Sequence, residues 1–262
     1  MKVINNVNKM QEWRNESGKI AFVATMGGLH EGHLSLIELA KQKADKVVVS
    51  VFVNPAQFSE NEDFGTYPRT LAVDLVLLKD KKVDVVFTPT IEQIYPDGVD
   101  EIFDIGWLGQ ILCGQSRPHF FNGVVQGVNR LFEIVQPDVA VFGQKDYQQL
   151  QAIKHFTSGV EIISAAIVRE QNGLAMSTRN QYLSADEYQI AAQLYQILLQ
   201  LQQGKIDKKS AIERLQVHFK LDYLEILDAN TLKQINSNTS KIAILCAVYL
   251  GKMRLIDNIV FN

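Results

Sequence analysis

The sequence KIAFVATMGGLHEGHLSLI, residues 19–37, determines how the first part of this chain is expected to fold. An apolar run from Ile20 to Ala24 stops at a turn carrying Gly27-Gly28, and apolar residues return at helical spacing from Leu34. This order predicts a strand, a glycine turn and a helix. Because a helix N-terminus presents N–H groups and a partial positive charge, we expect the turn to hold phosphate.

Two histidines, His30 and His33, lie in this turn with Gly32 between them. The zinc-protease pattern places its histidines at i and i+4 inside a helix, whereas these are three apart and stand at a helix entrance. A second alternative is that they only cap the helix. We favour a nucleotide-phosphate site, in which two imidazoles stabilise the charge that develops on an α-phosphate during attack.

Short β-branched runs alternate with helical patterns over the first two-thirds of the 262 residues. The alternation is typical of an α/β fold with a doubly wound, Rossmann-like parallel sheet. Strands are predicted at 19–24, 46–53, 83–88, 139–142 and 161–168, and helices at 33–44, 70–81, 123–135 and 146–157. Ligands of such sheets bind beyond the carboxyl ends of the strands.

The pattern changes near Asn172-Gly173, and we place a domain boundary after residue 176. Residues 1–176 then form the Rossmann-like domain and residues 177–262 a second, smaller α/β domain. The capping box Ser184-Ala185-Asp186-Glu187 predicts a helix to about residue 203. A shorter helix at 208–218 and strands at 223–227, 242–250 and 254–260 follow, the last two as a hairpin across Gly251-Lys252.

Composition narrows the class of protein. The net charge of -3 shows no basic excess, so nucleic acid is not expected as a partner. No apolar run approaches the ~18 residues that a membrane span needs. Cys113 and Cys246 are too few for a disulfide framework and are not spaced as a metal site. A reduced, cytoplasmic protein is expected.

A second group of phosphate-binding residue types is Met176-Ser177-Thr178-Arg179, which offers hydroxyl and bidentate guanidinium donors for a triphosphate. The alternative is a polar linker with one solvated arginine. Lys145 adds a point charge, and Asp146 can accept from a ribose or orient Lys145. Gly143 before them permits close approach of the backbone to a ligand.

Uncharged amides are expected near strand ends and the start of a helix, at Asn54, Gln57 and Gln149. They suit a small polar substrate with hydroxyls and a carboxylate, and routine loop bonding is the alternative. Asp74 is interpreted as part of a solvated helix face, with an outer magnesium contact as the alternative. Arg69 is expected to pair on the surface.

Several motifs occur in register along the chain: TMGGLHEGHLSL, FVNPAQF, YPRT, LCGQSRP, IVQPDVAVFGQKDYQQL and GLAMSTRNQYLS. With them the chain resembles the pantoate:β-alanine ligase family, the pantothenate synthetases, over nearly its whole length. The resemblance implies an attack of the pantoate carboxylate on the α-phosphorus of ATP, with loss of pyrophosphate. The amine of β-alanine then attacks the pantoyl adenylate, which gives pantothenate and AMP.

The resemblance also implies roles for individual residues. His33 is the proposed acid, with His30, Lys145 and Arg179 as the other catalytic residues. Gln57 and Gln149 are implied to hold pantoate, with Gln57 also near β-alanine. The implied ATP contacts are Met26, Gly27, Gly28, Leu29, His30, Glu31, Gly32, His33, Gly143, Gln144, Lys145, Asp146, Val168, Met176, Ser177, Thr178 and Arg179. Mg²⁺ is implied with the triphosphate, without assigned protein ligands, and a homodimer is implied as well. The small domain is expected to act as a lid.

The chain departs from the family pattern at several positions. Ala24 stands where the family usually has Pro, and Gln144 replaces the usual Glu. In Arg117-Pro118-His119-Phe120-Phe121-Asn122-Gly123-Val124, Phe120 and Asn122 replace a usual His and Arg. Two alternatives to the ligase stay open: a nucleotidyltransferase of the same superfamily with another acceptor, and a non-catalytic nucleotide sensor.

Overall fold

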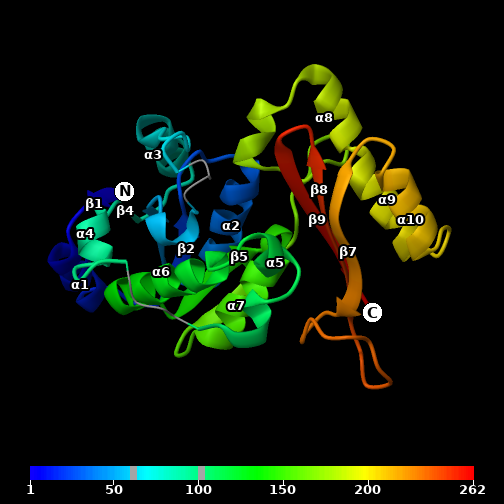
Figure 1. Cartoon of the computed structure of the whole chain (residues 1–262). Coiled ribbons are helices and arrows are strands. Elements are labelled where there is room, and N and C mark those ends of the chain that lie inside the picture. The colour runs from blue at the N-terminus through cyan, green and yellow to red at the C-terminus, as the bar shows by residue number, and fades with distance from the viewer. Residues whose placement is uncertain (60–63, 100–103) are drawn as a thin grey trace. The chain divides into compact units, whose positions relative to one another are not determined.

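The computed structural model describes residues 1–59, 64–99 and 104–262 and forms two compact units (Figure 1). Unit 1 comprises residues 1–144 and 152–165, and unit 2 comprises residues 145–151 and 166–262. Unit 1 thus ends at Ala165, whereas the sequence pattern places the domain boundary after residue 176. The division into functional domains, and the role of the smaller one as a lid, stay predictions.

Unit 1 is built on a six-stranded parallel sheet, which confirms the Rossmann-like α/β fold. The strands are β1 (Lys2–Ile4), β2 (Ile20–Thr25), β3 (Lys46–Val51), β4 (Val85–Phe87), β5 (Val139–Gly143) and β6 (Glu161–Ala165). Their order is β1-β4-β3-β2-β5-β6. The chain proceeds outward from β2 through β3 to β4 and then returns to the other side of β2 with β5. This reversal between β2 and β5 is the position where doubly wound sheets bind ligands.

Helices cover both faces of this sheet (Figure 1). Ala21 and Val23 of β2 belong to the same core cluster as Ile37 of α2. Phe22, which points to the opposite face, meets Phe132 of α6 edge to face at 6.1 Å. The alternation along β2 therefore separates two apolar layers. The helices are α1 (Val7–Asn15), α2 (Glu31–Lys41), α3 (Leu71–Asp80), α4 (Ile91–Ile94), α5 (Cys113–Ser116), α6 (Phe120–Val135) and α7 (Tyr147–Phe156).

Unit 2 contains an antiparallel sheet in the order β7-β8-β9 and three helices. The predicted hairpin across Gly251-Lys252 is confirmed, because Leu250 pairs with Met253. The single helix predicted over 184–203 is wrong: two helices meet at Ala192, and no glycine or proline marks the break. The elements are α8 (Ala185–Ala191), α9 (Gln193–Gln202), α10 (Lys208–Leu215), β7 (Lys220–Asp228), β8 (Ile242–Leu250) and β9 (Met253–Phe261).

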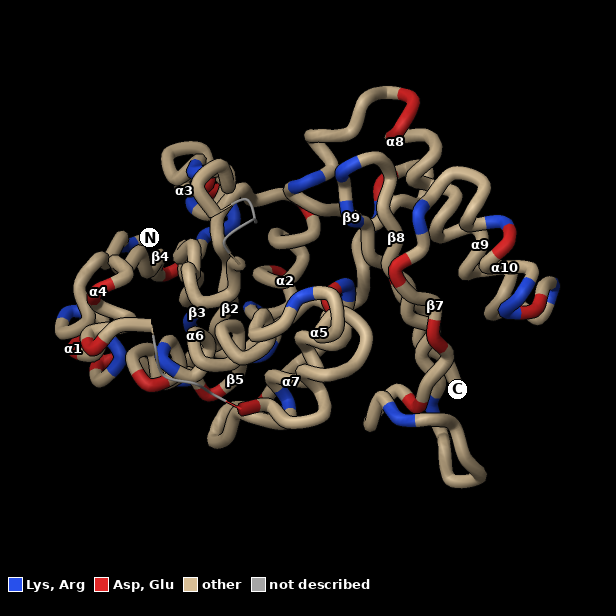
Figure 2. The backbone as a smooth tube through the Cα atoms, viewed as in Figure 1, with Lys and Arg blue, Asp and Glu red and all other residues tan. Residues whose placement is uncertain are grey.

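Charges of both signs are interspersed along each unit (Figure 2). Cys113 and Cys246 are both buried and free in this structure. Within residues 1–59, 64–99 and 104–262, no helix has the length and apolar character that crossing a membrane requires.

Helix α6 packs against the short 3-10 helix η1 (Pro55–Gln57), which follows β3. Contact is close because Gly123 has no side chain: a Cβ there would overlap the carbonyl oxygen of Ala56. One turn later, a Cβ at Gly127 would lie 2.5 Å from Asn54 Nδ2. Two glycines on one face of α6 therefore allow the loop after β3 to lie directly on the helix.

We expect Gly123→Ala to destabilise the chain by about 2 kcal/mol or more, because overpacking at a rigid backbone contact forces the loop away from α6. The measurement is the free energy of unfolding from a denaturant titration. Gly65→Ala is the matched control, since no atom lies within 4 Å of a Cβ at that position. It is expected to change stability by less than about 0.5 kcal/mol. Equal stability of the two variants would contradict the close packing of α6 on η1.

Candidate active site

The residues predicted to form the site divide between the two units. Unit 1 holds the turn from Met26 to His33 after β2, Gln57 after β3, and Gly143-Gln144 at the end of β5. These three segments follow the carboxyl ends of neighbouring parallel strands, so they lie at one edge of the sheet. Unit 2 holds the remaining ones: Lys145, Asp146, Gln149, Val168, Met176, Ser177, Thr178 and Arg179.

The turn after β2 is shaped by two glycines in the left-handed region, with φ of +86° at Gly27 and +63° at Gly28. A residue with a Cβ adopts positive φ only at an energetic cost, which explains why two glycines occupy these positions. Helix α2 then begins at Glu31, two residues before the predicted start at His33, with His30 as its N-cap. The two histidines are thus part of the helix entrance itself.

His30 and His33 close the helix entrance reciprocally. The Gly32 N–H donates to Nδ1 of His30 at 3.1 Å, and the His30 N–H donates to Nδ1 of His33 at 3.4 Å. The rings lie 4.2 Å apart between centroids. Because Nδ1 of each ring accepts a hydrogen bond, the proton of each neutral imidazole is on Nε2. Both rings therefore carry their N–H donor on the nitrogen away from the helix backbone. Capping of the helix uses Nδ1 of each ring, which leaves the Nε2–H as the donor that phosphate chemistry would need, so the two roles are compatible.

Asp74 is where the structure departs most from the sequence interpretation. Its side chain is not on a solvated helix face: the residue is 1 % exposed. Its carboxylate accepts from the N–H of Leu29 at 2.9 Å and the N–H of Gly28 at 3.1 Å, and from Oγ1 of Thr70 at 3.2 Å. Helix α3 thus places a buried carboxylate beneath the glycine turn. Arg69, just before α3, donates to the backbone oxygens of Phe64 and Gly65.

The N–H groups of the turn are used inside the protein. Those of Gly28 and Leu29 donate to Asp74, that of Gly27 donates to Thr25 Oγ1 at 3.3 Å, and those of His30 and Gly32 donate to imidazoles. These five N–H groups have partners within the protein, and the binding of phosphate at the turn stays a prediction.

Gln57 and Met26, both predicted site residues, are brought together: Nε2 of Gln57 donates to Sδ of Met26 at 3.0 Å. Asn54 is 5 % exposed and supports the loop that carries Gln57. Its Nδ2 donates to the Gly123 oxygen at 3.0 Å, and its Oδ1 accepts from the Ala56 N–H at 3.1 Å. Asn54 therefore orients the Gln57 loop on α6.

Tyr95 completes this network, and its part in it could not be seen in the sequence. Its hydroxyl donates to Oδ1 of Asn54 at 2.7 Å. Burial raises the pKa of Tyr95 to about 12, so the hydroxyl stays protonated and remains a donor at neutral pH. Arg117 lies nearby in the network, donating to the backbone oxygen of Gln57 at 3.4 Å while its guanidinium stacks 3.6 Å from the ring centroid of Phe120.

In unit 2 the predicted phosphate residues lie on two segments. Lys145 Nζ is 3.7 Å from Asp146 Oδ2, which agrees with the interpretation that Asp146 can orient Lys145. The backbone oxygen of Lys145 accepts from Asn258 Nδ2 at 2.9 Å. Gln149 is half-buried on α7.

The second segment is a short hairpin in which the Met176 N–H donates to the oxygen of Val168. Ser177 caps the 3-10 helix η4 (Thr178–Tyr182) by accepting from the Arg179 N–H. Arg169, at the base of the hairpin, forms a two-pronged ion pair with buried Asp257 at 2.6 and 2.9 Å.

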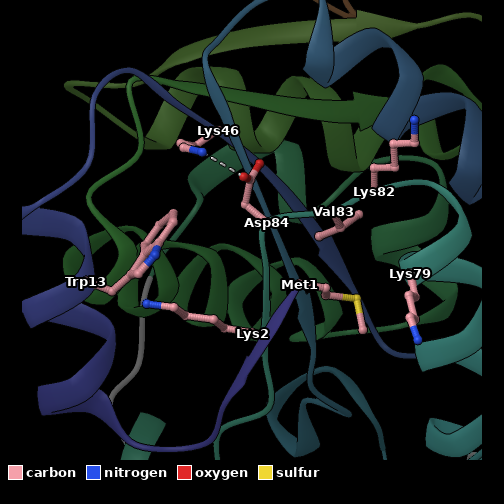
Figure 3. Close-up of a pocket in the computed structure, with 8 residues that line it drawn as sticks. All are labelled: Met1, Lys2, Trp13, Lys46, Lys79, Lys82, Val83 and Asp84. Atoms are coloured by element: carbon pink, nitrogen blue, oxygen red, sulfur yellow. Dashed lines mark hydrogen bonds and ion pairs between the residues drawn. The ribbon is translucent and has the colours of Figure 1, made fainter.

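A cavity of about 500 Å³ lies apart from these residues (Figure 3). Its lining comes from the amino ends of the unit 1 strands and from neighbouring helices: Met1, Lys2, Trp13, Lys46, Lys79, Lys82, Val83 and Asp84. None of the predicted site residues lines it. In a parallel sheet the amino ends lie at the edge opposite the carboxyl ends, so this cavity is not part of the candidate site.

Tyr95→Phe should destabilise the chain by about 1–2 kcal/mol, because it removes one buried hydrogen bond and leaves Asn54 Oδ1 with only the Ala56 N–H. Thermal unfolding monitored by circular dichroism measures the effect. Tyr182→Phe is the control, since Tyr182 is 47 % exposed. A Tyr95 variant as stable as the Tyr182 variant would show that the hydroxyl does not support the Gln57 loop.

Comparison with known proteins places this arrangement in a family. The sequence pattern of the family described as pantoate-beta-alanine ligase matches residues 2–260. The chain is 59 % identical over 263 residues to the pantothenate synthetase of Vesicomyosocius okutanii subsp. Calyptogena okutanii. This alignment covers 96 % of the present chain and 93 % of that protein.

Solved structures agree with this. The crystal structure of pantothenate synthetase from Thermus thermophilus superposes with a TM-score of 0.90 at 37 % identity, covering 99 % of both chains. The pantoate-beta-alanine ligase from Francisella tularensis, complexed with beta-gamma ATP and beta-alanine, has a TM-score of 0.83 at 36 % identity and covers 99 % of this chain and 97 % of its own. With the match extending over both units, this chain belongs to the pantoate-beta-alanine ligase family.

Proposed function

We propose that the chain condenses pantoate with β-alanine through a pantoyl adenylate, using the residues described above in the following roles. The ligase activity itself follows from membership of the family, whose pattern extends over residues 2–260. The observation that carries the mechanism is the pair of imidazoles at the β2–β5 reversal, each with its proton on Nε2. A neutral donor pair of this kind suits a reaction in which negative charge grows on a phosphate.

The first step transfers an adenylyl group. A carboxylate oxygen of pantoate forms a bond to the α-phosphorus of ATP, the bond to the bridging oxygen breaks, and its electron pair leaves with pyrophosphate. In the second step the neutral amine of β-alanine attacks the acyl carbon. The C–O bond breaks, AMP leaves with that electron pair, and the amine loses a proton as the amide forms. Both steps build negative charge that positioned donors can stabilise.

His33 and His30 donate from Nε2 to oxygens of the α-phosphate in this proposal, with the rest of the turn, Met26–Gly32, alongside ATP. Gln57 holds pantoate and lies near β-alanine, and Gln149 also holds pantoate. Gly143, Gln144 and Asp146 contact ATP next to Lys145, whose ammonium neutralises phosphate charge. Val168, Met176, Ser177, Thr178 and Arg179 supply the remaining contacts, with Arg179 as the bidentate donor.

Mg²⁺ enters the proposal as part of the substrate, bound to the phosphates of ATP. In the parts of the chain that the structure describes, no group of three or more His, Cys, Asp or Glu side chains is arranged to hold a metal ion. Mg²⁺ usually retains several waters and is held by substrate phosphates with one or two carboxylates, so such a cage is not required. We assign no chemical step to the ion. We further propose a cytoplasmic homodimer, on the basis of the family resemblance.

Release of AMP and pyrophosphate should require pantoate and β-alanine together with ATP. Omitting β-alanine while adding labelled pyrophosphate should still give pantoate-dependent exchange into ATP, because the adenylate forms reversibly. The measurement is AMP, pyrophosphate and pantothenate by chromatography for each omission. AMP transfer to another acceptor without an amide product would support the nucleotidyltransferase alternative, and tight ATP binding without turnover would support the sensor.

His33→Ala and Lys145→Ala should each lower the rate of adenylate formation by about 10²-fold or more, which is the usual loss when a transition-state donor is removed. The rate is measured as pantoate-dependent pyrophosphate exchange. His218→Ala and Lys252→Ala are the matched controls, since both residues are exposed and distant in sequence from the proposed site. Near-normal exchange in both test variants would refute the residue assignment.

A further inference from the structure

We propose that Asp74 is a positioning residue, which holds His30 and His33 in the orientation and tautomer that adenylate formation needs. Its consequence for catalysis rests on the proposed function, whereas its effect on the imidazoles does not. Asp74 touches neither ring: it acts through the backbone of the glycine turn. The contact joins α3 to a turn 45 residues earlier in the chain.

Asp74 is engaged by three donors at once. Oδ1 accepts from the Leu29 N–H, and Oδ2 accepts from both the Gly28 N–H and the Thr70 hydroxyl. The carboxylate is buried, so these bonds are shielded from competing water. Bonds of an ionised acceptor to backbone N–H groups are also among the stronger hydrogen bonds in proteins. Asp74 is therefore a strong restraint on the path of the backbone from Gly28 to Leu29.

The restrained backbone at Leu29 is directly followed by His30, so the position of Leu29 affects the histidines. Leu29 precedes His30, whose own N–H must point at Nδ1 of His33 for the reciprocal cap to form. Asp74 Oδ2 also lies 3.1 Å from the position that a Cβ would have on Gly27. The carboxylate is therefore packed against the two left-handed residues of the turn and sets the direction in which His30 enters α2.

The chemistry of the site requires a carboxylate at position 74. Two of the three groups that contact the side chain are backbone N–H groups, which can only donate, and an ionised carboxylate is the one common side-chain group of this shape that only accepts. In Asp74→Asn, the amide oxygen can accept from the N–H of only one of Gly28 and Leu29. The NH₂ group, itself a donor, then faces the other N–H. At least one backbone N–H of the turn then loses its partner, and the turn must move.

The experiment compares Asp74→Asn with the unchanged full-length chain by two measurements. Long-range ¹H–¹⁵N NMR of the imidazoles reports the tautomer, and signals are assigned with His30→Gln and His33→Gln. Pantoate-dependent pyrophosphate exchange reports kcat and KM for ATP. In Asp74→Asn we expect His30 and His33 to lose the pure Nε2–H pattern and kcat to fall by about 10- to 100-fold, the effect of a misplacement of about 1 Å.

Asp84→Asn is the matched control. Asp84 is also an aspartate of unit 1 that accepts from a backbone N–H, that of Val47 at 2.9 Å, but it lies at the amino end of β4. We expect this variant to keep both histidine patterns and its exchange rate. Thr70→Val is a milder second variant, which removes one of the three donors and should shift the histidine signals less than Asp74→Asn. It keeps the test decisive if Asp74→Asn does not fold.

Three results would overturn the proposal. Unchanged histidine signals in both Asp74→Asn and Thr70→Val would show that the carboxylate does not set the tautomer. A change of the same size in Asp84→Asn would show that the effect is a general loss of stability. A raised requirement for Mg²⁺ with intact histidine signals would make Asp74 a metal ligand instead. Absence of exchange in the unchanged chain would contradict the proposed function, while the NMR comparison would still decide the role of Asp74.

Discussion

The hydrogen bonds between the buried carboxylate of Asp74 and the backbone of Gly28 and Leu29 are the interaction on which the candidate site of unit 1 depends. Gly27 and Gly28 adopt positive φ without a steric penalty, but a glycine pair is also free to adopt many other conformations, and the carboxylate holds it in this one. With the turn in this shape, His30 caps α2 and the two imidazoles lie 4.2 Å apart between centroids, with their planes tilted by 43°.

Buried polar side chains also hold other loops of the two units in place by hydrogen bonds. In unit 1, Asn54 and Tyr95 hold the loop of Gln57 against α6, where Gly123 permits backbone contact. In unit 2, two neighbouring residues of β9 act in parallel. Asp257 binds Arg169 at the base of the Val168–Met176 hairpin, and Asn258 binds the backbone of Lys145. Burial raises the pKa of the Asp257 carboxyl, and the Arg169 guanidinium opposes this rise.

Much of the fold could be predicted from periodicity, because strands such as β3 and helices such as α6 have continuous apolar patterns. The strand β1 was not predicted, since three residues show no period and the strand is defined by its pairing with β4. The break at Ala192 has no local signal either. In the site, the histidine turn could be recognised by residue type. The role of Asp74 could not, because its burial is decided by a contact far away in the sequence.

The central claim is that pantoate is activated as an adenylate by phosphate chemistry at the histidine turn. The most direct test follows an oxygen atom. With pantoate labelled with ¹⁸O in its carboxylate, the bond that forms to phosphorus and later breaks at the acyl carbon must leave one labelled oxygen in AMP. Mass spectrometry of AMP after turnover with β-alanine should therefore find one ¹⁸O per molecule. Unlabelled AMP, or label in pyrophosphate instead, would contradict the account.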